Sequence, residues 1–340
     1  MPTARGKAHM WAEDEIARAA ELACRLEVEA EKPGNVTPSH ALPKLSYRDF
    51  VASSTAVAPV LGEAGRRPVG ETILRAVRAT RAVTSVNTNL GTILLLAPLA
   101  RAAALAKVAG GAPGEVAGAE TPAKLTLALR RALAGVLAGL EVADAELVFE
   151  AIRLAAPGGM GRVASQDLSG RPTVTLLEAM RIAAPRDAVA REYATGFAIT
   201  FGTALGLLEA AFAASRDIRA AAVELALELQ VRAPDTLIAR KFGAAAAEEA
   251  SARARAVLAA GPRGSAARER ETSSFDDWLR DPARRWNPGT TADLVAAALF
   301  VRLLVAGAAD QDLETDRPRT SGDASAGGGR RPARQALARP

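Results

Sequence analysis

Six short segments of the 340-residue chain combine glycine or proline with side chains that bind anions, metal ions or sugar hydroxyls. They are "EVEAEKPGNV" (27–36), "VGETI" (69–73), "SVNTNLG" (85–91), "PGGMGRVASQDL" (157–168), "PDTLIARKFG" (234–243) and "NPGTTADLV" (287–295). Their carboxylates are Glu27, Glu71, Asp167, Asp235 and Asp293. Such a set suits a divalent metal with a phosphorylated ligand, or glycosyl transfer through an oxocarbenium ion. The residue types alone leave both chemistries open.

Each segment also has a purely structural interpretation. Thr290 or Thr291 with Asp293 would make a good helix N-terminus without any ligand. The run from Lys32 to Asn35 could be a simple β-turn, and 157–161 could only end a helix. Asn87 and Asn89 could cap the apolar helix that follows them. Three arginines at three-residue spacing could simply form a solvent-exposed helix face. Those basic residues are Arg75, Arg78 and Arg81.

Several common catalytic classes are excluded by the motifs that the chain lacks. It contains neither GxGxxG after a strand nor GxxxxGK[ST], so neither dinucleotide fingerprint nor P-loop is present. The two histidines, His9 and His40, both lie in the first 40 residues, which makes a Ser-His-Asp triad improbable. Cys24 is the single cysteine, so there is no internal disulfide and almost nothing for a zinc site.

The distribution of charge and apolar residues argues against nucleic-acid and membrane partners. Several arginines behind the net charge of +5 belong to the tail after residue 315, and aromatic residues do not interleave with basic ones. The N-terminus is too charged for a signal peptide, and the longest apolar stretch, 93–106, is interrupted by Arg101. We therefore expect a cytoplasmic protein.

The fold class predicted by composition and periodicity is all-α, a single-domain helical bundle. Hydrophobic residues make up 49% of the chain and aromatic residues only 4%, with Ala and Leu dominant. Thr121 with Pro122 predicts the start of a helix over "AKLTLALRRALAGVLAGL", Asp144 predicts the cap of the next, and Thr175 with Glu178 predicts a capping box. Further helices are expected near 188–213, 216–231, 236–260 and 291–306.

The remaining segments are expected to be loops or disordered termini. Residues 109–120 and 261–274 are rich in glycine, alanine and charge, which is typical of surface loops. We expect a flexible N-terminus over 1–14, an all-helical catalytic domain over 15–308 and a disordered tail over 309–340.

Taken in order, five of the segments resemble the triphosphoribosyl-dephospho-CoA synthase family, the ATP:dephospho-CoA triphosphoribosyltransferases. The matching motifs are "EVEAEKPGNV", "NTNLG", "PGGMGRVASQDL", "PDTLIARK" and "NPGTTADLVAA", and the resemblance runs from about residue 15 to residue 306. It implies an all-helical transferase that joins ATP to 3'-dephospho-CoA with release of adenine. The product is a prosthetic-group precursor, and Mg²⁺ is the expected cofactor.

The resemblance also implies roles for particular residues. Lys32 and Arg240 would contact phosphates, and Asn87, Thr88 and Asn89 would hydrogen-bond ribose or phosphate oxygens beside Gly91, whose lack of a side chain admits close approach. Glu71, Asp167 and Asp293 would hold Mg²⁺ or act as the base, with Asp167 and Asp293 as the metal ligands. Three further members of the nucleotide site are predicted: Gly34, Asn35 and Asp235.

One motif departs from the family pattern. Asn89 and Leu90 stand where the best-known members have a His-Lys pair, so a positive charge is missing from the expected triphosphate site. "KPGNV" and "NTNLG" are more similar to the archaeal and methylotroph branch of the family. Two alternatives stay open: the same fold and nucleotide site with a different acceptor, or a non-catalytic helical accessory protein. A homodimer is compatible with the alanine-rich helices.

Overall fold

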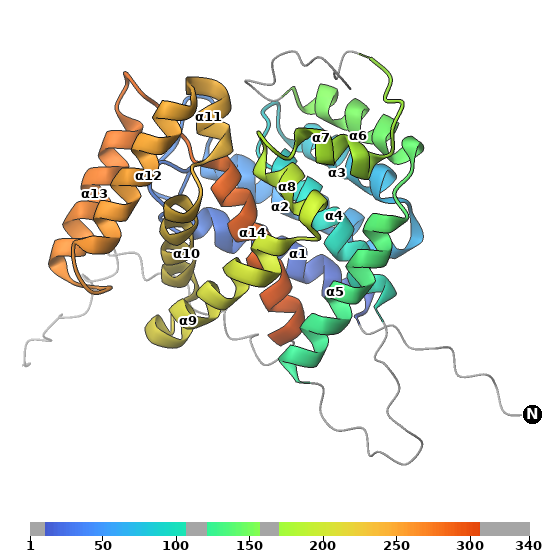
Figure 1. Ribbon diagram of the computed structural model, residues 1–340, viewed down its shortest axis with the longest axis horizontal. Helices are drawn as coiled ribbons and strands as arrows, with labels where there is room; N and C mark the ends of the chain where they lie inside the picture. Colours follow the sequence, from blue (N-terminus) through green and yellow to red (C-terminus); the bar gives the residue numbers. More distant parts are fainter. Residues whose placement is uncertain (1–10, 107–120, 157–169, 307–340) are drawn as a thin grey trace, which may run out of the picture. The chain divides into compact units, whose positions relative to one another are not determined.

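The computed structural model describes residues 11–106, 121–156 and 170–306, and these residues form an all-α fold (Figure 1). In order, the helices are α1 (Glu13–Glu29), α2 (Tyr47–Gly62), the 3₁₀ turn η1 (Glu63–Arg66), α3 (Val69–Val83), α4 (Leu90–Leu105), α5 (Pro122–Ala138), α6 (Val142–Ala155), α7 (Leu176–Ala183), α8 (Ala188–Thr195), the π turn η2 (Thr200–Ala204), α9 (Leu205–Ser215), α10 (Ile218–Arg232), α11 (Thr236–Phe242), α12 (Ala244–Ala259), α13 (Ala266–Arg280) and α14 (Gly289–Ala306). The described residues contain no strand, which confirms the predicted fold class.

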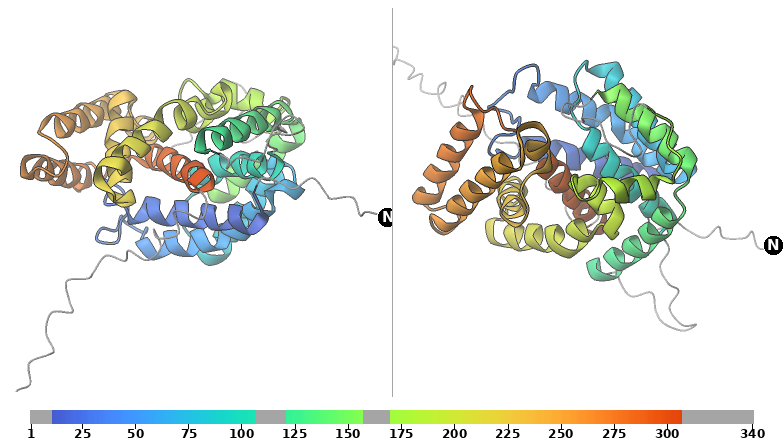
Figure 2. Two further views of the ribbon diagram at one scale, coloured as in Figure 1. Left: turned by 90° about the horizontal axis from the view of Figure 1, so that it is seen from below. Right: turned by 45° about the horizontal axis from the view of Figure 1, so that its top comes forward.

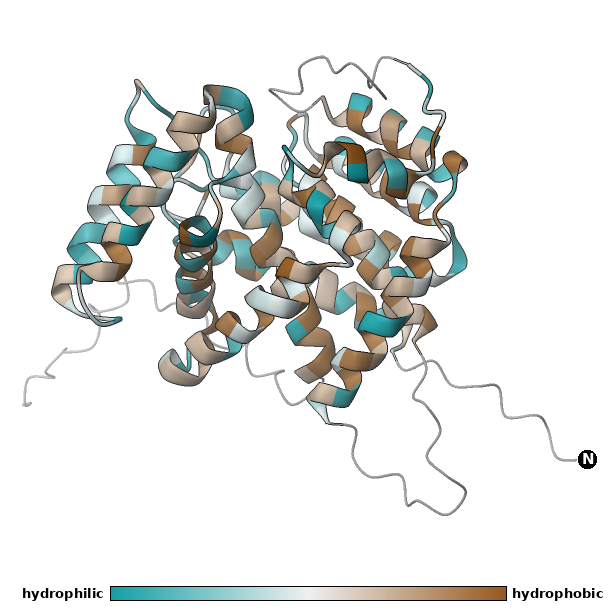
Figure 3. Cartoon of the chain, viewed as in Figure 1, coloured by the Kyte–Doolittle hydropathy of each residue, from teal (hydrophilic) through white to brown (hydrophobic). Residues whose placement is uncertain are grey.

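Two apolar helices, α4 and α14, form the centre of the packing. Both are buried on nearly every side, and they contact each other. Around them, α1 and α10 pack on α14, and α3 and α5 pack on α4. Figure 1 shows α14 among these neighbours, and the brown of α14 in Figure 3 marks its hydrophobic composition. Helices α1 and α2 lie side by side (Figure 2, left). The N-termini of α4 and α14 carry two of the polar segments.

By length and apolar composition alone, α14 could cross a membrane. The same is true of α8 and Thr200–Ser215 together, if this bent pair is taken as one span. However, 78% of α14 is buried within the protein. A helix that is apolar all round and covered by its neighbours is typical of a globular core.

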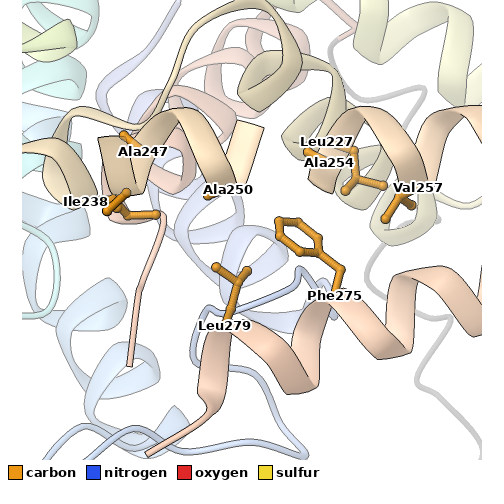
Figure 4. Packing of buried hydrophobic residues seen from close by; sticks show 9 residues of the cluster. Leu227, Ile238, Ala247, Ala250, Ala254, Val257, Phe275 and Leu279 are labelled. Carbon is orange, nitrogen blue, oxygen red and sulfur yellow. The ribbon is translucent and has the colours of Figure 1, made fainter. Parts of the chain in front are cut away.

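A second apolar cluster is formed by residues of α10, α11, α12 and α13. Helix α13 of this cluster also contacts the polar segment 27–36. Phe275 and Leu279 project from α13 toward α12, as Figure 4 shows, and both are fully buried. From the same helix, Asp276 Oδ1 accepts a hydrogen bond from Gly34 N at 2.7 Å, and Arg280 donates to Asn35 O at 2.6 Å. Helix α13 therefore fixes the turn that follows α1.

Most predicted helix starts are confirmed. Thr121 accepts a hydrogen bond from Lys124 N at the start of α5, and Thr175 and Glu178 form the capping box of α7. Asp144 is not an N-cap, because α6 begins at Val142. The Asp144 carboxylate instead accepts from Glu141 N at 3.0 Å and from Gly70 N at 2.7 Å, which ties α6 to α3.

Three predicted boundaries were wrong for identifiable reasons. The helix expected over 188–213 breaks after α8, because the buried Glu192 carboxylate accepts hydrogen bonds from Ile199 N and Thr200 N. The helix over 236–260 breaks at Gly243, which has a φ of +95°. The loop expected over 261–274 is largely α13, because its Ala, Arg and Glu residues favour helix and Ser265 caps it.

The other boundary predictions fall outside the described residues. These are residues 1–10 of the flexible terminus expected over 1–14, the loop 109–120, the turn 157–161 and the tail 309–340. For residues 11–14 the prediction was wrong, because Trp11 is buried with its Nε1 donating to Leu304 O at 2.8 Å and α1 begins at Glu13.

Candidate functional site

A small cavity of about 60 Å³ lies where the end of α1 meets the N-termini of α4 and α14. It is lined by residues from three of the sequence segments and from α1, α2 and α4: Cys24, Glu27, Asn35, Val36, Phe50, Thr88, Asn89, Thr92, Asn287, Gly289, Ala292 and Asp293. Ligand pockets commonly span several hundred Å³. A cavity of this size can hold reacting atoms but not a whole nucleotide.

The segment before α4 is fastened by its own polar side chains. Asn87 Oδ1 accepts a hydrogen bond from Leu90 N at 3.2 Å, and Thr88 Oγ1 lies 2.7 Å from Ser53 Oγ. Thr80 Oγ1 donates to Asn89 Oδ1 at 3.1 Å. The first of these bonds caps α4, and the other two tie the segment to α2 and α3.

Asn89 has a donor that the fold does not use. Its side chain is 7% exposed, yet Nδ2 has no hydrogen-bond partner among the described residues. Leaving a buried amide N–H group without an acceptor costs free energy, and such groups are rare in folded proteins. Because Asn89 lines the cavity, its Nδ2 group is available to an acceptor oxygen of a bound molecule.

Gly91 allows the Asp293 carboxylate to lie directly against α4. A Cβ atom at position 91 would meet Asp293 Oδ2 at 1.9 Å, well inside any tolerated contact. From the same turn of α4, Thr92 Oγ1 donates to Asp293 Oδ1 at 2.8 Å. The Asp293 carboxyl group is thus held between two long helices.

Asp293 retains its proton at neutral pH. Burial raises its pKa from the ordinary value of 3.8 to about 8. The carboxylates of Glu27, Asp235 and Asp187 raise the pKa further, and the hydrogen bond from Thr92 opposes them. A carboxyl group with a pKa near the working pH is a good proton-transfer group.

Lys32 is buried against the end of α1. Its Nζ lies 2.9 Å from Glu27 Oε1, and it also donates to the carbonyl oxygens of Glu27 and Ala30. The side chain is 1% exposed. Since an ammonium group has three hydrogens, every donor of Lys32 is used within the protein, and a phosphate would have to displace one of these acceptors.

Gly34 and Asn35 form the turn that separates Lys32 from the cavity. Asn35 N donates to Lys32 O at 3.2 Å across the predicted β-turn, with Gly34 at a φ of +78°. A Cβ atom on Gly34 would lie 2.8 to 2.9 Å from Leu279, Pro288 and the Trp286 carbonyl oxygen, so only glycine fits. Asn35 Nδ2 donates to Asn287 Oδ1 at 2.7 Å, which closes one side of the cavity.

Asp235 lies outside the cavity lining and links α11 to α14. One oxygen accepts from Leu237 N and Ile238 N as the N-cap of α11, and the other accepts from Thr291 N at 2.7 Å and Thr291 Oγ1 at 2.8 Å. Burial raises the pKa of Asp235 above its usual range, although these four hydrogen bonds oppose the shift. This carboxylate has a full set of partners without a ligand.

Arg240 and Glu71 also lie apart from the cavity lining. Arg240 Nη1 donates to Asp187 Oδ2 at 2.8 Å. Glu71 pairs with Arg75 at 2.8 Å on α3 and borders a separate pocket of about 620 Å³ with Arg67 and Arg78. The Arg75 and Arg78 side chains are more than half exposed, in agreement with a solvated face.

The structure brings together Asn35, Thr88, Asn89 and Asp293 from the predicted site, with Gly91 in contact with Asp293. Asp167 lies outside the described residues, so the pairing of Asp167 with Asp293 as metal ligands is untested. Within the described ranges, no group of three His, Cys, Asp or Glu residues could hold a metal ion. The polar lining residues that the sequence did not assign to the site are Cys24, Thr92 and Asn287, and Glu27 was grouped with the candidate carboxylates without a role of its own. Glu27 and Asn287 lie inside quoted segments, whereas nothing in the sequence singled out Thr92.

We expect Gly91→Ala to reduce turnover about 100-fold, because the added methyl group displaces the Asp293 carboxyl group and small misplacements are that costly. Gly135→Ala is the matched control, since its Cβ meets no atom within 4 Å. The control should keep full activity and gain about 0.5–1 kcal/mol of stability. Steady-state kinetics and urea unfolding of both variants check this, and full activity of Gly91→Ala would remove Asp293 from the chemistry.

Comparison with known proteins identifies the family to which the chain belongs. A model of the family described as ATP:dephospho-CoA triphosphoribosyl transferase matches residues 13–312. A crystal structure from Archaeoglobus fulgidus, provisionally assigned as a triphosphoribosyl-dephospho-CoA synthase, is 26% identical, with a TM-score of 0.54 over 75% of this chain and 98% of that chain. No curated protein matches the chain significantly.

Proposed function

Because the chain belongs to the ATP:dephospho-CoA triphosphoribosyl transferase family, we propose that the cavity between α1, α4 and α14 is the reaction centre of this enzyme. The enzyme transfers a triphosphoribosyl group from ATP to dephospho-CoA. The observation that carries the assignment is the Asp293 carboxyl group, buried with a pKa of about 8 in the same cavity as the unpartnered Nδ2 of Asn89.

The reaction makes three demands on this cavity. C1 of the ATP ribose becomes positively charged as its bond to adenine breaks, so a nearby negative charge stabilises it. Adenine leaves as a neutral base only if it gains a proton, and the acceptor hydroxyl must lose one as its oxygen bonds to C1. The two proton transfers balance, and no oxidant or reductant is needed.

Asp293 meets the demand for an acid. At neutral pH it carries a proton, because its pKa is about 8, and the hydrogen bond from Thr92 fixes its orientation. It therefore donates that proton to the departing adenine. This assignment refines the sequence-based expectation, in which Asp293 was a base or a metal ligand.

The N-termini of α4 and α14 supply positive potential for the triphosphate. Residues from the start of both helices line the cavity, and the dipole of a helix attracts phosphate to its N-terminus. Asn89 Nδ2 adds one hydrogen-bond donor for a ribose or phosphate oxygen. These features take the place of the lysine that position 90 lacks.

We expect Mg²⁺ to reach the site bound to ATP. The described residues do not fit a resident metal centre: Glu27 is already paired with Lys32, and the Asp293 carboxyl group is uncharged at neutral pH. Mg²⁺ usually keeps waters and binds through substrate phosphates. We therefore expect MgATP as the donor. The reaction belongs in the cytoplasm, and the homodimer remains a prediction.

The acceptor is tested by comparing dephospho-CoA with CoA, which differs by one phosphate on the acceptor ribose. Chromatography should detect adenine with dephospho-CoA and MgATP, and far less with CoA. Equal release with both, or release only with another nucleotide, would favour the alternative in which this fold serves a different coenzyme pathway.

A further inference from the structure

A buried ion pair at the end of α1 borders the reaction cavity. Glu27 is 7% exposed at the last turn of α1 and lines the cavity, and Lys32 lies 2.9 Å away and is 1% exposed. Removing two charges from water is costly, and well-packed uncharged residues of similar size are often as stable or more so. The pair therefore calls for an explanation beyond packing.

Two carboxyl groups of the described residues line the cavity, and their surroundings differ. Glu27 forms an ion pair with Lys32, whereas burial raises the pKa of Asp293 on helix α14 to about 8. Among the described residues, the other titratable group that lines the cavity is Cys24, one turn before Glu27, and burial raises the pKa of its thiol far above the usual range. Two carboxyl groups whose environments push their ionisation apart are a common acid and base arrangement.

We propose that Glu27 is the general base that takes the proton from the acceptor's ribose hydroxyl, and that Lys32 is the positioning residue that keeps Glu27 ionised and aimed at the cavity. This inference rests on the proposed function. The hydroxyl O–H bond breaks, its oxygen bonds to C1 of the ATP ribose, and the proton passes to Glu27. The bond from C1 to adenine breaks, and Asp293 supplies the proton that adenine takes. The two carboxyl groups then return to their starting states by exchanging a proton through solvent.

Lys32 also has a structural role that the test must separate. It donates to the carbonyl oxygens of Glu27 and Ala30 at the end of α1, so its removal loosens that terminus. A single substitution of either partner would leave the other charge buried alone. Loss of activity in a single variant would therefore not distinguish catalysis from misfolding.

The double variant Glu27→Gln/Lys32→Met removes both charges and keeps the side-chain volumes. We expect a melting temperature close to wild type, a retained thermal shift with MgATP, and at least a 100-fold fall in kcat, which is about the contribution of a general base. Wild-type kcat in the folded double variant would overturn the proposal. If wild-type protein itself releases no adenine, the proposed function fails instead, so the two failures are distinguishable.

If the double variant does not fold, the single variant Glu27→Asp tests whether Glu27 is the general base. This change keeps the charge for Lys32 and withdraws the carboxylate by one methylene group. The base proposal expects kcat to fall by about tenfold or more while the KM for ATP and the melting temperature stay near wild type. An unchanged kcat would contradict it.

Discussion

Replacing Asp293 with asparagine should lower turnover by a factor of about 100 to 10,000 and leave the helical fold intact. The amide has nearly the shape of the carboxyl group and can still accept the hydrogen bond from Thr92 Oγ1, but it cannot donate a proton to adenine. General acid catalysis typically contributes a factor on the order of 10²–10⁴. Single-turnover adenine release and far-UV circular dichroism check the two parts of this expectation.

The same variant should be more stable than wild type at neutral and alkaline pH. The pKa of Asp293 rises from 3.8, its ordinary value, to about 8 in the folded protein, so the folded state binds a proton that the unfolded state has lost. The contribution of Asp293 to the free energy of unfolding of the wild type is therefore fully present below about pH 4. It falls between about pH 4 and pH 8, with a limiting slope of about 1.4 kcal/mol per pH unit. The neutral amide of the variant does not titrate, so its contribution to stability stays constant over this range.

Urea unfolding of wild type and Asp293→Asn at pH 5, 6, 7 and 8 measures this difference. The gap in stability between the variant and wild type should widen steadily as the pH rises. Loss of helix content in the variant, or a gap that does not change with pH, would show that Asp293 is a structural cap.

Asp235→Ala should destabilise the protein by about 3 kcal/mol. The substitution leaves the N–H groups of Leu237, Ile238 and Thr291 and the hydroxyl of Thr291 without their shared acceptor. Loss of an N-cap typically costs about 1 kcal/mol, and hydrogen bonds to a buried charged group contribute about 1.5–3 kcal/mol.

Asp217→Ala is the matched control for this loss. Asp217 is the N-cap of α10 and accepts hydrogen bonds from Arg219 N and Ala220 N, but it is exposed, and no other helix of the described residues donates to its carboxylate. Its removal should cost only about 1 kcal/mol. Equal losses in urea unfolding of the two variants would show that the link from α11 to α14 contributes nothing.

The fold was largely predictable because its helices are long and their starts carry recognisable caps. Apolar periodicity and the caps at Thr121 and Thr175 located α5 and α7. The breaks after α8 and at Gly243 were missed because they depend on positive φ values, at Gly196 and Phe197 in the first case and at Gly243 in the second, and backbone conformation leaves no mark on apolar periodicity. Charged residues in 261–274 concealed α13, whose apolar anchors Phe275 and Leu279 lie beyond that range.

The site was predictable only in part, since caps and ligand-binding groups use the same residue types. Asn87 caps α4, whereas Asn89, two positions later, keeps a free donor in the cavity. Asp235 and Asp293 both follow glycine- or proline-containing segments, yet one is saturated by backbone N–H groups and the other is not. Whether such a residue caps a helix or faces the cavity depends on residues far away in the chain.

The most direct test of the account is adenine release from purified protein incubated with ATP, Mg²⁺ and 3'-dephospho-CoA, with each component omitted in turn. We predict adenine only in the complete mixture, together with a product whose mass equals the sum of ATP and dephospho-CoA minus adenine. Adenine formed without dephospho-CoA, or none in the complete mixture, would contradict the transferase assignment for this chain.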